Sequence, residues 1–269
     1  MDNVNDFFAT LSSYLWGWPM IVLLLGTHVF LSVRLRFPQR KLFTAIRLSV
    51  QRDKSQKGDV SQFGALATAL AATIGTGNII GVATAVALGG PGAVFWCWLT
   101  GVFGISTKYS EALLAIKYRV KSEKGHMLGG PMYTLERGLG WRKMGILFAV
   151  FTAIAAFGIG CTVQANAIST IMHASYGIST SVSGAVLMLL AAAVILGGVR
   201  SISKVCSMLV PFMALLYVLG CIYILCMNVV YVVPALKLIV NSAFSPEAAG
   251  GGLAGGSVIM AARYGIARG

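Results

Sequence analysis

The chain has 269 residues, of which 57% are hydrophobic and 11% are charged, and its mean hydropathy is +0.80. Soluble domains carry about 25% charged residues, so this composition excludes a soluble domain and indicates an all-α, polytopic membrane protein. The formal net charge is +13, but the cations are grouped between apolar stretches that carry almost none. This grouping follows the positive-inside rule, so the expected surroundings are a lipid bilayer and no nucleic acid.

Two basic clusters set the expected orientation. The first lies between residues 34 and 57 and the second between residues 117 and 143. Cytoplasmic loops carry the excess of Lys and Arg, so both clusters are expected in the cytoplasm and the N-terminus outside. The members are Arg34, Arg36, Arg40, Lys41, Arg47, Arg52, Lys54 and Lys57, then Lys117, Arg119, Lys121, Lys124, Arg137, Arg142 and Lys143.

The first spanning helix is expected over about residues 13–33. Trp16 and Trp18 would anchor its start at the membrane interface. Residues 34–61 follow as a cytoplasmic segment in which apolar residues alternate with the cations. That pattern predicts an amphipathic helix lying at the interface.

The next apolar stretch, residues 65–92, reads ALATALAATIGTGNIIGVATAVALGGPG and carries no charge. It is long enough to span a bilayer, yet its middle, from Thr73 to Asn78, is a poor helix. Glycine there costs about 1 kcal/mol of helix propensity relative to alanine, and Thr76 and Asn78 compete for backbone hydrogen bonds. A broken helix in a membrane needs protein or a polar cavity around it, so a binding site is one interpretation. Close helix packing through Gly77 and Gly81 is the other, and both stay open on these residues alone.

Three stretches follow the central helix in the expected topology. Residues 93–116 run inward, with Lys108 and Glu111 interpreted as an interfacial pair rather than a gate. Within residues 117–144, the sequence MYTLERGL is expected to form a short helix that starts at Pro131. Residues 145–172 run outward, and one of Gln164 and Asn166 is expected to face the polar interior, since they lie roughly 200° apart on a helix.

Beyond these, residues 181–199 run inward to Arg200 and Lys204, and residues 205–230 run outward. Residues 231–248 form an outside segment. Residues 250–269 are glycine-rich and are expected to begin another broken, inward helix. We expect the chain to be incomplete, because a helix of that kind has no natural end at Gly269.

Several long motifs resemble one known family. They are ATIGTGNIIGVATAVALGGPGAVFWCW, STKYSEALLAIKYR, GGPMYTLERGLG and AFSPEAAGGGLAGG followed by ARYGIARG. In this order they resemble the alanine or glycine:cation symporter family. One departure is Thr134, where the family commonly has a second aromatic after GGPMY. The other is the absence of the FSNEAG-type motif that follows ARG in the family and forms its second broken helix.

The resemblance implies the LeuT-type fold of two inverted repeats. The first repeat would occupy about residues 62–230 of a single membrane domain, 1–269, after an extra helix at about 13–33. Such a protein is a secondary transporter of the plasma (inner) membrane of bacterial type and not an enzyme. It couples uptake of a small neutral amino acid, such as alanine or glycine, to Na⁺ or in some members H⁺, and it needs no other cofactor. The chain alone would be inactive, since it covers roughly the first three-fifths of a typical member.

The resemblance also implies the site. The amides of Thr76 and Gly77 beside Gly75 would bind the substrate carboxylate, and Gln164 would face the substrate from a later helix. One sodium ion would be bound by Asn78 and the Thr73 region, and carbonyls near Ala71 and Ile74 could bind a second.

Three other classes of membrane protein are alternatives to a transporter. An ion channel also uses glycine-rich broken segments, but a filter is a short re-entrant loop and residues 65–92 are long enough to cross. A non-transporting membrane subunit is a further alternative. A membrane enzyme is disfavoured, because Glu111 alone among the acids is near the bilayer interior and no His or Cys constellation accompanies it.

Overall fold

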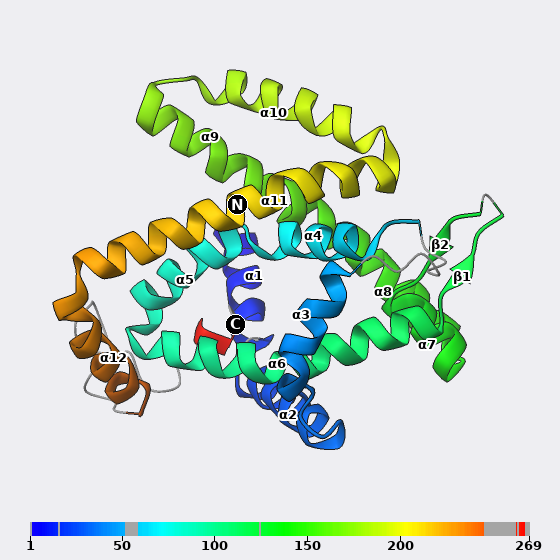
Figure 1. Cartoon of the computed structure of the whole chain (residues 1–269), viewed down its shortest axis with the longest axis horizontal. Coiled ribbons are helices and arrows are strands. Elements are labelled where there is room, and N and C mark those ends of the chain that lie inside the picture. The colour runs from blue at the N-terminus through cyan, green and yellow to red at the C-terminus, as the bar shows by residue number, and fades with distance from the viewer. Residues whose placement is uncertain are drawn as a thin grey trace. The chain divides into compact units, whose positions relative to one another are not determined.

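The computed structural model describes residues 2–15, 17–51, 59–123, 125–244, 262 and 264–266. Most of these residues are helical, so the expected all-α class is confirmed (Figure 1). The helices and strands in chain order are α1 (Asp2–Leu15), α2 (Trp18–Arg34), η1 (Pro38–Lys41), α3 (Leu42–Val50), α4 (Gln62–Thr73), α5 (Thr76–Gly89), α6 (Gly92–Lys117), β1 (Val120–Lys121), β2 (Met127–Leu128), α7 (Pro131–Leu139), α8 (Arg142–Ala155), η2 (Ala156–Thr162), α9 (Val163–Tyr176), α10 (Thr180–Ile195), α11 (Gly198–Met227) and α12 (Val229–Phe244).

The N-terminal apolar segment forms two helices rather than the single helix expected over residues 13–33. α1 ends at Leu15, and α2 begins at Trp18 with a proline, Pro19, in its first turn. Proline lacks an N–H and clashes with the preceding turn, so it costs least in the first turn of a helix. The expected start was therefore wrong. Trp16 lies outside the described residues, so its role as an interfacial anchor stays a prediction.

The first basic segment contains the helix expected there. The α2 helix and the stretch Pro38–Val50 meet at an angle of 64°. Arg36 and Phe37 both adopt φ of +58°, a left-handed conformation that costs a non-glycine residue about 1–2 kcal/mol. Because two such residues precede Pro38, the chain turns sharply and cannot continue α2. The helix itself is confirmed, and its position at a membrane interface stays a prediction.

The chain divides into two compact units, which are described one at a time. The first unit comprises Met1–Phe43, Gly77–Ser110 and Val218–Gly269. The second comprises Thr44–Thr76 and Glu111–Tyr217.

In the first unit, α2 and η1 are joined to α6 by hydrogen bonds that are buried or partly buried. His28 Nδ1 lies 2.6 Å from Thr107 Oγ1, and the hydroxyls of Ser32 and Ser106 are 2.8 Å apart. Gln39 Nε2 donates to both serine hydroxyls at 2.9 Å. Both serines are completely buried. We call these five residues the α2–α6 polar seam. Buried polar groups of this kind are expensive to leave unpaired, so the seam fixes the relative position of the two helices.

The same unit contains a helix that we did not expect. Residues 231–248 were expected as an outside segment that holds only Lys237, but α12 occupies Val229–Phe244. The helix packs on the start of α6, where a Cβ added at Gly92 would meet the backbone oxygen of Ser242 at 2.5 Å. Glycine therefore permits a close backbone approach, and this packing outweighs the cost of the internal proline.

In the second unit, two helical hairpins follow the strands (Figure 1). α7 begins at Pro131, as expected, and packs on α8, where a Cβ added at Gly145 would lie 2.8 Å from the Met132 backbone oxygen. α9 and α10 also lie side by side, joined by a turn in which Gly177 has φ of +68°. The antiparallel β1–β2 hairpin, which pairs Lys121 with Met127, was not expected from the sequence.

Two helix boundaries differ from those expected around residue 200. α10 ends at Ile195 and α11 begins at Gly198, which has φ of +70°. Glycine adopts this conformation at no steric cost, so the chain turns before the cations rather than after them. Arg200 and Lys204 therefore belong to α11 and not to a connecting segment.

Several described helices suit a lipid bilayer. Three helical stretches in the described part of the chain are long and apolar enough to cross one, namely Gln62–Gly89, Arg142–Tyr176 and Gly198–Met227. The bent pair Pro19–Arg34 and Pro38–Val50 makes a fourth if it is counted as one span. These stretches support a polytopic membrane protein. The start of a further broken helix at residues 250–269 falls almost wholly outside the described residues.

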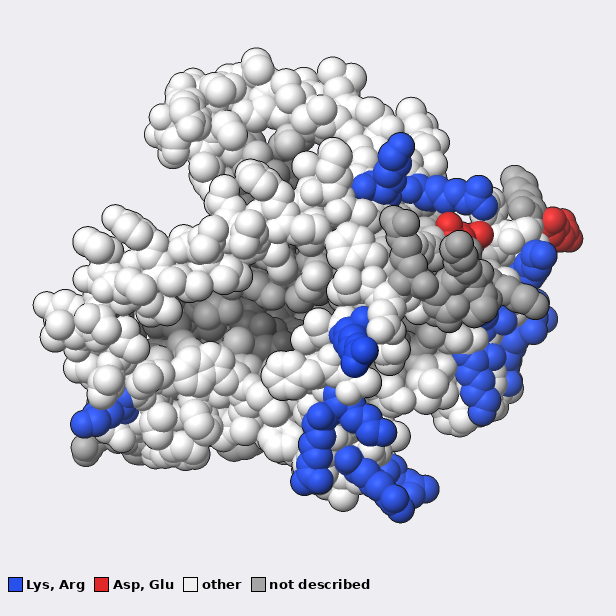
Figure 2. Space-filling view, in the orientation of Figure 1, with Lys and Arg blue, Asp and Glu red and all other residues white. Residues whose placement is uncertain are grey.

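The charged side chains of the second unit are unevenly distributed. Lys and Arg gather over the β1–β2 hairpin and the α7–α8 end of the unit, whereas the α9–α10 hairpin shows neither sign of charge (Figure 2). The sequence agrees, since residues 163–195 contain no Asp, Glu, Lys or Arg. An uncharged hairpin beside a basic end is the distribution that a membrane-embedded segment with one aqueous end requires.

Candidate functional site at the helix break

The expected break in the central helix is confirmed. α4 ends at Thr73, Ile74 leaves the helical region with ψ of 83°, and α5 begins at Thr76. The interruption is thus narrower than the predicted span from Thr73 to Asn78, because only Ile74 and Gly75 are non-helical. Thr76 and Asn78 instead form the first turn of α5, where their side chains compete least with the helix.

The C-terminal end of α4 presents carbonyl groups. The Ile74 N–H donates to Leu70 O at 2.7 Å, and the Gly75 N–H donates to Thr73 O at 3.0 Å rather than to Ala71 O. Within the described residues, the carbonyls of Ala71 and Ala72 are therefore left without a backbone partner. Carbonyls at the C-terminal end of a helix carry partial negative charge, so they suit a cation. Ala71, Thr73 and Ile74 lie at this end, as the resemblance implies for a sodium site.

The N-terminal end of α5 presents amide groups. The first N–H groups of a helix have no partner within it, and the described chain provides no backbone acceptor for those of Thr76, Gly77 and Asn78. A Cβ added at Gly77 would meet no described atom within 4 Å. Open amides at a helix N-terminus attract a carboxylate. Asn78 is exposed and makes no hydrogen bond in the described part of the chain.

Gln164 lies against this break, within the second unit. The Thr76 hydroxyl donates to Gln164 Oε1 at 2.7 Å, and a Cβ added at Gly75 would lie 3.5 Å from Gln164 Nε2. Gln164 is partly buried, whereas Asn166 is exposed. Gln164 is therefore the residue of this pair that lies against the break, and its place in a polar interior stays a prediction. Four residues were predicted to bind the substrate, and three of them, Gly75, Thr76 and Gln164, lie together in the structure. For the fourth, Gly77, no contact with Gln164 is found among the described residues.

A π-helical segment places Gln164, and the sequence had not suggested it. η2 covers Ala156–Thr162 between α8 and α9, and it ends directly before the α9 turn that carries Gln164. π segments rotate the residues that follow and are frequent at functional sites. The signal available in the sequence was the pair Gly158 and Gly160, which weakens a regular helix here.

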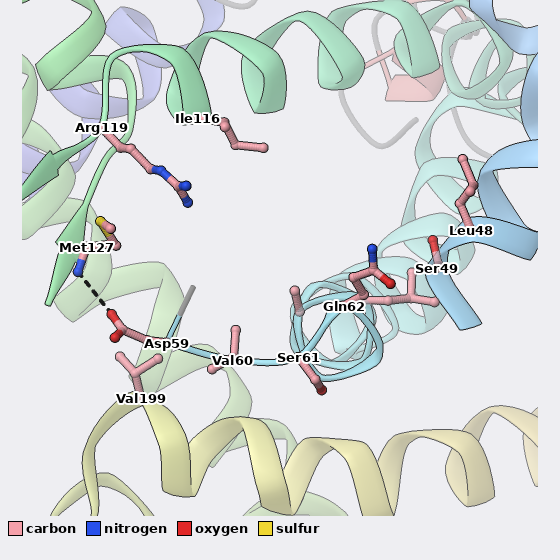
Figure 3. A pocket seen from close by; sticks show the side chains of 12 residues that line it. Leu48, Ser49, Asp59, Val60, Ser61, Gln62, Ile116, Arg119, Met127 and Val199 are labelled. Carbon is pink, nitrogen blue, oxygen red and sulfur yellow. Dashed lines mark hydrogen bonds between the residues drawn. The ribbon is translucent and has the colours of Figure 1, made fainter. Parts of the chain in front are cut away.

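A pocket at the other end of α4 was also missed. It has a volume of about 800 Å³ and lies within the second unit. Asp59 and Arg119 bring opposite charges to its lining, and Ser61 caps α4 beside them by accepting a hydrogen bond from the Gly64 N–H at 3.0 Å. In Figure 3 the Arg119 side chain extends toward the hollow while Asp59 turns to Met127. The pocket thus adjoins the end of α4 opposite the break.

The described residues contain no group of three or more His, Cys, Asp or Glu that could hold a metal ion. A cation at the break would therefore be bound by backbone carbonyls, hydroxyls and amide oxygens. Such hard, neutral oxygen donors suit an alkali cation better than a transition metal. The residues at the break fit sodium in this respect.

An interrupted, apolar helix with free carbonyls on one side and free amides on the other is typical of membrane transport proteins. The comparison with protein families agrees with this class. The family model described as "Sodium:alanine symporter family" matches residues 1–269, and the chain belongs to this family of transporters, which are not enzymes.

Two curated relatives show the extent of the similarity. The sodium/alanine symporter AgcS of Methanococcus maripaludis is 50% identical over 264 residues, which cover 96% of this chain and 58% of AgcS. An uncharacterized transporter of Haemophilus influenzae is 49% identical over 269 residues, which cover 99% of this chain and 59% of the relative. The chain thus spans less than two thirds of the length of both.

Proposed function

We propose that this chain carries the amino acid and sodium site of a symporter that moves a small neutral amino acid, alanine or glycine, together with Na⁺. The observation that carries the proposal is the hydrogen bond between Thr76 and Gln164 at the helix break, beside the open amides of α5. The name of the M. maripaludis relative, a sodium/alanine symporter, supports alanine as the substrate. Coupling to H⁺ instead of Na⁺ would be detected as uptake that follows a proton gradient.

The break offers a suitable cradle for an amino acid. The substrate carboxylate would accept hydrogen bonds from the Thr76 and Gly77 amides, because unpaired N–H groups at a helix N-terminus favour anions. Gln164 can donate from Nε2 or accept at Oε1, so it suits the polar end of a zwitterion. Gly75 provides no side chain, and a Cβ there would already lie in contact with Gln164, so the space favours a small ligand.

Sodium would bind on the α4 side of the same break. The carbonyls of Ala71 and Ile74, the Thr73 region and the Asn78 amide oxygen are the proposed ligands. A cation there would neutralise the negative end of α4 and attract the substrate carboxylate. Binding of each ligand would then favour binding of the other, which is the thermodynamic basis of coupling.

The fold and orientation are part of the proposal. We propose a LeuT-type arrangement in which about residues 62–230 form the first inverted repeat and the N-terminal membrane helix precedes it. Transport would proceed by alternating access in a plasma membrane, with the basic clusters in the cytoplasm and the N-terminus outside. We further propose that residues 1–269 on their own do not transport, because the mechanism places the site between two broken helices and we assign only the α4–α5 break, among the described residues, to that role.

Uptake of radiolabelled alanine into proteoliposomes tests the function. The protein used is the gene product that contains residues 1–269. An inward Na⁺ gradient is expected to drive saturable uptake, and an equal K⁺ gradient is not. Glycine in excess is expected to compete, whereas a large amino acid such as tryptophan is not. Uptake that follows a proton gradient alone, or no uptake by a folded protein in any gradient, would contradict the proposal.

A further inference from the structure

The start of α4 is tied to the β1–β2 hairpin by a hydrogen bond of a carboxylate. The Met127 N–H donates to Oδ2 of Asp59 at 3.0 Å (Figure 3). Nδ1 of His126 lies 3.9 Å from the same oxygen. The Asp59 side chain is 22% exposed, so solvent competes with this bond only in part. Hydrogen bonds to an ionised carboxylate are roughly twice as strong as neutral ones. Asp59 is thus a strong anchor, 68 positions away from its partner in sequence.

Asp59 holds α4 at the end where a contact has the greatest effect on the direction of the helix. α4 has 12 residues, which correspond to about 18 Å at 1.5 Å per residue. Beyond its other end, Ile74 and Gly75 form a two-residue connection that belongs to neither helix. A displacement of about 3 Å at the Asp59 end would tilt such a helix by roughly 10°. Small movements at Asp59 therefore change the direction in which α4 meets the break.

The face of α4 that would move is closely packed. A Cβ added at Gly64 would clash with the side-chain Oγ of Ser203 on α11, so α11 packs closely against α4 there. Ala67, one turn further along, is only 1% exposed. Residues three apart share one face of a helix, so Gly64 and Ala67 lie on one buried face of α4, which we call its seat. A tilt of α4 would expose Ala67.

We propose that Asp59 is a positioning residue for transport: its bond to the Met127 amide keeps α4 in its seat and so limits how often the pocket beside Asp59 opens along the helix toward the break. The proposal rests on the proposed function, since opening of that pocket matters only if the break binds a transported solute. Arg119 also lines this pocket and carries the charge opposite to that of Asp59. The hydrogen bond proposed to hold α4 involves only the Asp59 carboxylate and the Met127 amide.

A thiol placed in the seat measures this opening directly. The Ala67→Cys variant is made in a background that lacks the five native cysteines, Cys97, Cys161, Cys206, Cys221 and Cys226. Reconstituted protein is treated with the membrane-permeant reagent N-ethylmaleimide, and the rate of modification is followed by mass spectrometry. Asp59→Ala removes the acceptor and Met127→Pro removes the donor N–H. Glu123→Ala, an exposed acid on the same hairpin, is the matched control. A Ser183→Cys thiol in α10, at a position 8% exposed, reports general loosening.

Loss of a charge-assisted bond is expected to raise the Ala67→Cys modification rate by roughly fivefold to twentyfold in either variant. The double variant should be no faster than the single ones, because both remove the same bond. In the Glu123→Ala variant, the Ala67→Cys thiol should react at the parent rate. The Ser183→Cys thiol should react at its parent rate in every variant. Parent rates at Ala67→Cys in both variants, additive effects in the double variant, or an equal rise at Ser183→Cys would overturn the proposal. The readout involves no uptake, so its failure is distinguishable from failure of the proposed function.

Discussion

The Thr76 hydroxyl donates a 2.7 Å hydrogen bond to Oε1 of Gln164, and this bond joins the first residue of α5 to α9 across 88 positions of the sequence. The bond orients the Gln164 amide so that its oxygen faces Thr76. Its two N–H donors remain for another acceptor, since Nε2 makes no hydrogen bond within the described residues. An amide that is held by one neighbour and still offers donors is suited to a ligand that arrives and leaves.

Thr76→Val tests whether the hydroxyl orients Gln164. Valine keeps the shape of threonine and removes the donor, so the alanine concentration at half-maximal uptake is expected to rise about twofold to tenfold, the worth of one net hydrogen bond. Thr76→Ser retains the hydroxyl and should behave like the parent. The same half-saturation value for Thr76→Val and the parent would show that the bond does not serve binding.

Gly77→Val separates an effect on the site from an effect on stability. No described atom lies within 4 Å of a Cβ at Gly77, and other residues favour a helix over glycine by up to about 1 kcal/mol, so the variant should fold. Its side chain would nevertheless cover the amides of α5. We expect a melting temperature close to that of the parent and no measurable alanine uptake. Normal uptake at normal expression would show that the α5 amides do not bind the substrate.

Asn78→Leu tests the sodium ligand. The exchange keeps the volume of the side chain and removes its oxygen, which Na⁺ needs as a ligand. Uptake driven by Na⁺ is expected to be abolished, while Asn78→Ser, which keeps an oxygen, should require more Na⁺ for half-maximal uptake. The measurement is uptake against Na⁺ concentration at fixed alanine. An unchanged Na⁺ dependence of uptake in Asn78→Leu would show that Asn78 is not a sodium ligand.

Gln39→Leu tests the α2–α6 polar seam. The Gln39 amide donates to Ser32, to Ser106 and, at 3.2 Å, to Val102 O, and both serines are completely buried. Removal of these donors is expected to lower the free energy of unfolding by about 1–3 kcal/mol and the melting temperature with it. The control is Thr152→Val, an exposed residue whose hydroxyl, within the described residues, bonds to Phe148 O of its own helix. Equal melting temperatures for the two variants would mean that the seam does not stabilise the protein.

The central break could be predicted from the sequence because its signals are local. Two glycines alternate there with Thr76 and Asn78, and each acts on its own turn of the helix. The start of α7 at Pro131 was predictable for the same reason. The family motifs then added Gln164, which periodicity alone could not choose over Asn166.

The features that the sequence did not reveal depend on contacts between distant segments. α12 forms despite Pro234 because Gly92 and Ser242 allow its backbone to approach α6. The turn before α11 depends on the φ of Gly198 and not on the cations that follow it. The bond between Asp59 and Met127 joins an acid to a backbone amide, and no pattern of side chains in the sequence marks a backbone partner.

Binding of radiolabelled alanine to Gln164 variants tests the central claim most directly. Equilibrium binding is measured in Na⁺ and in K⁺ for the gene product that contains residues 1–269, with Gln164→Leu compared with Asn166→Leu, an exposed position two residues along the same helix. The account predicts Na⁺-dependent binding in the parent and in Asn166→Leu, and a loss of at least about tenfold in affinity for Gln164→Leu, because its two amide donors and its bond to Thr76 are removed together. Parent affinity in Gln164→Leu, or binding that does not require Na⁺, would contradict the assignment of the amino acid and sodium site to the break between α4 and α5.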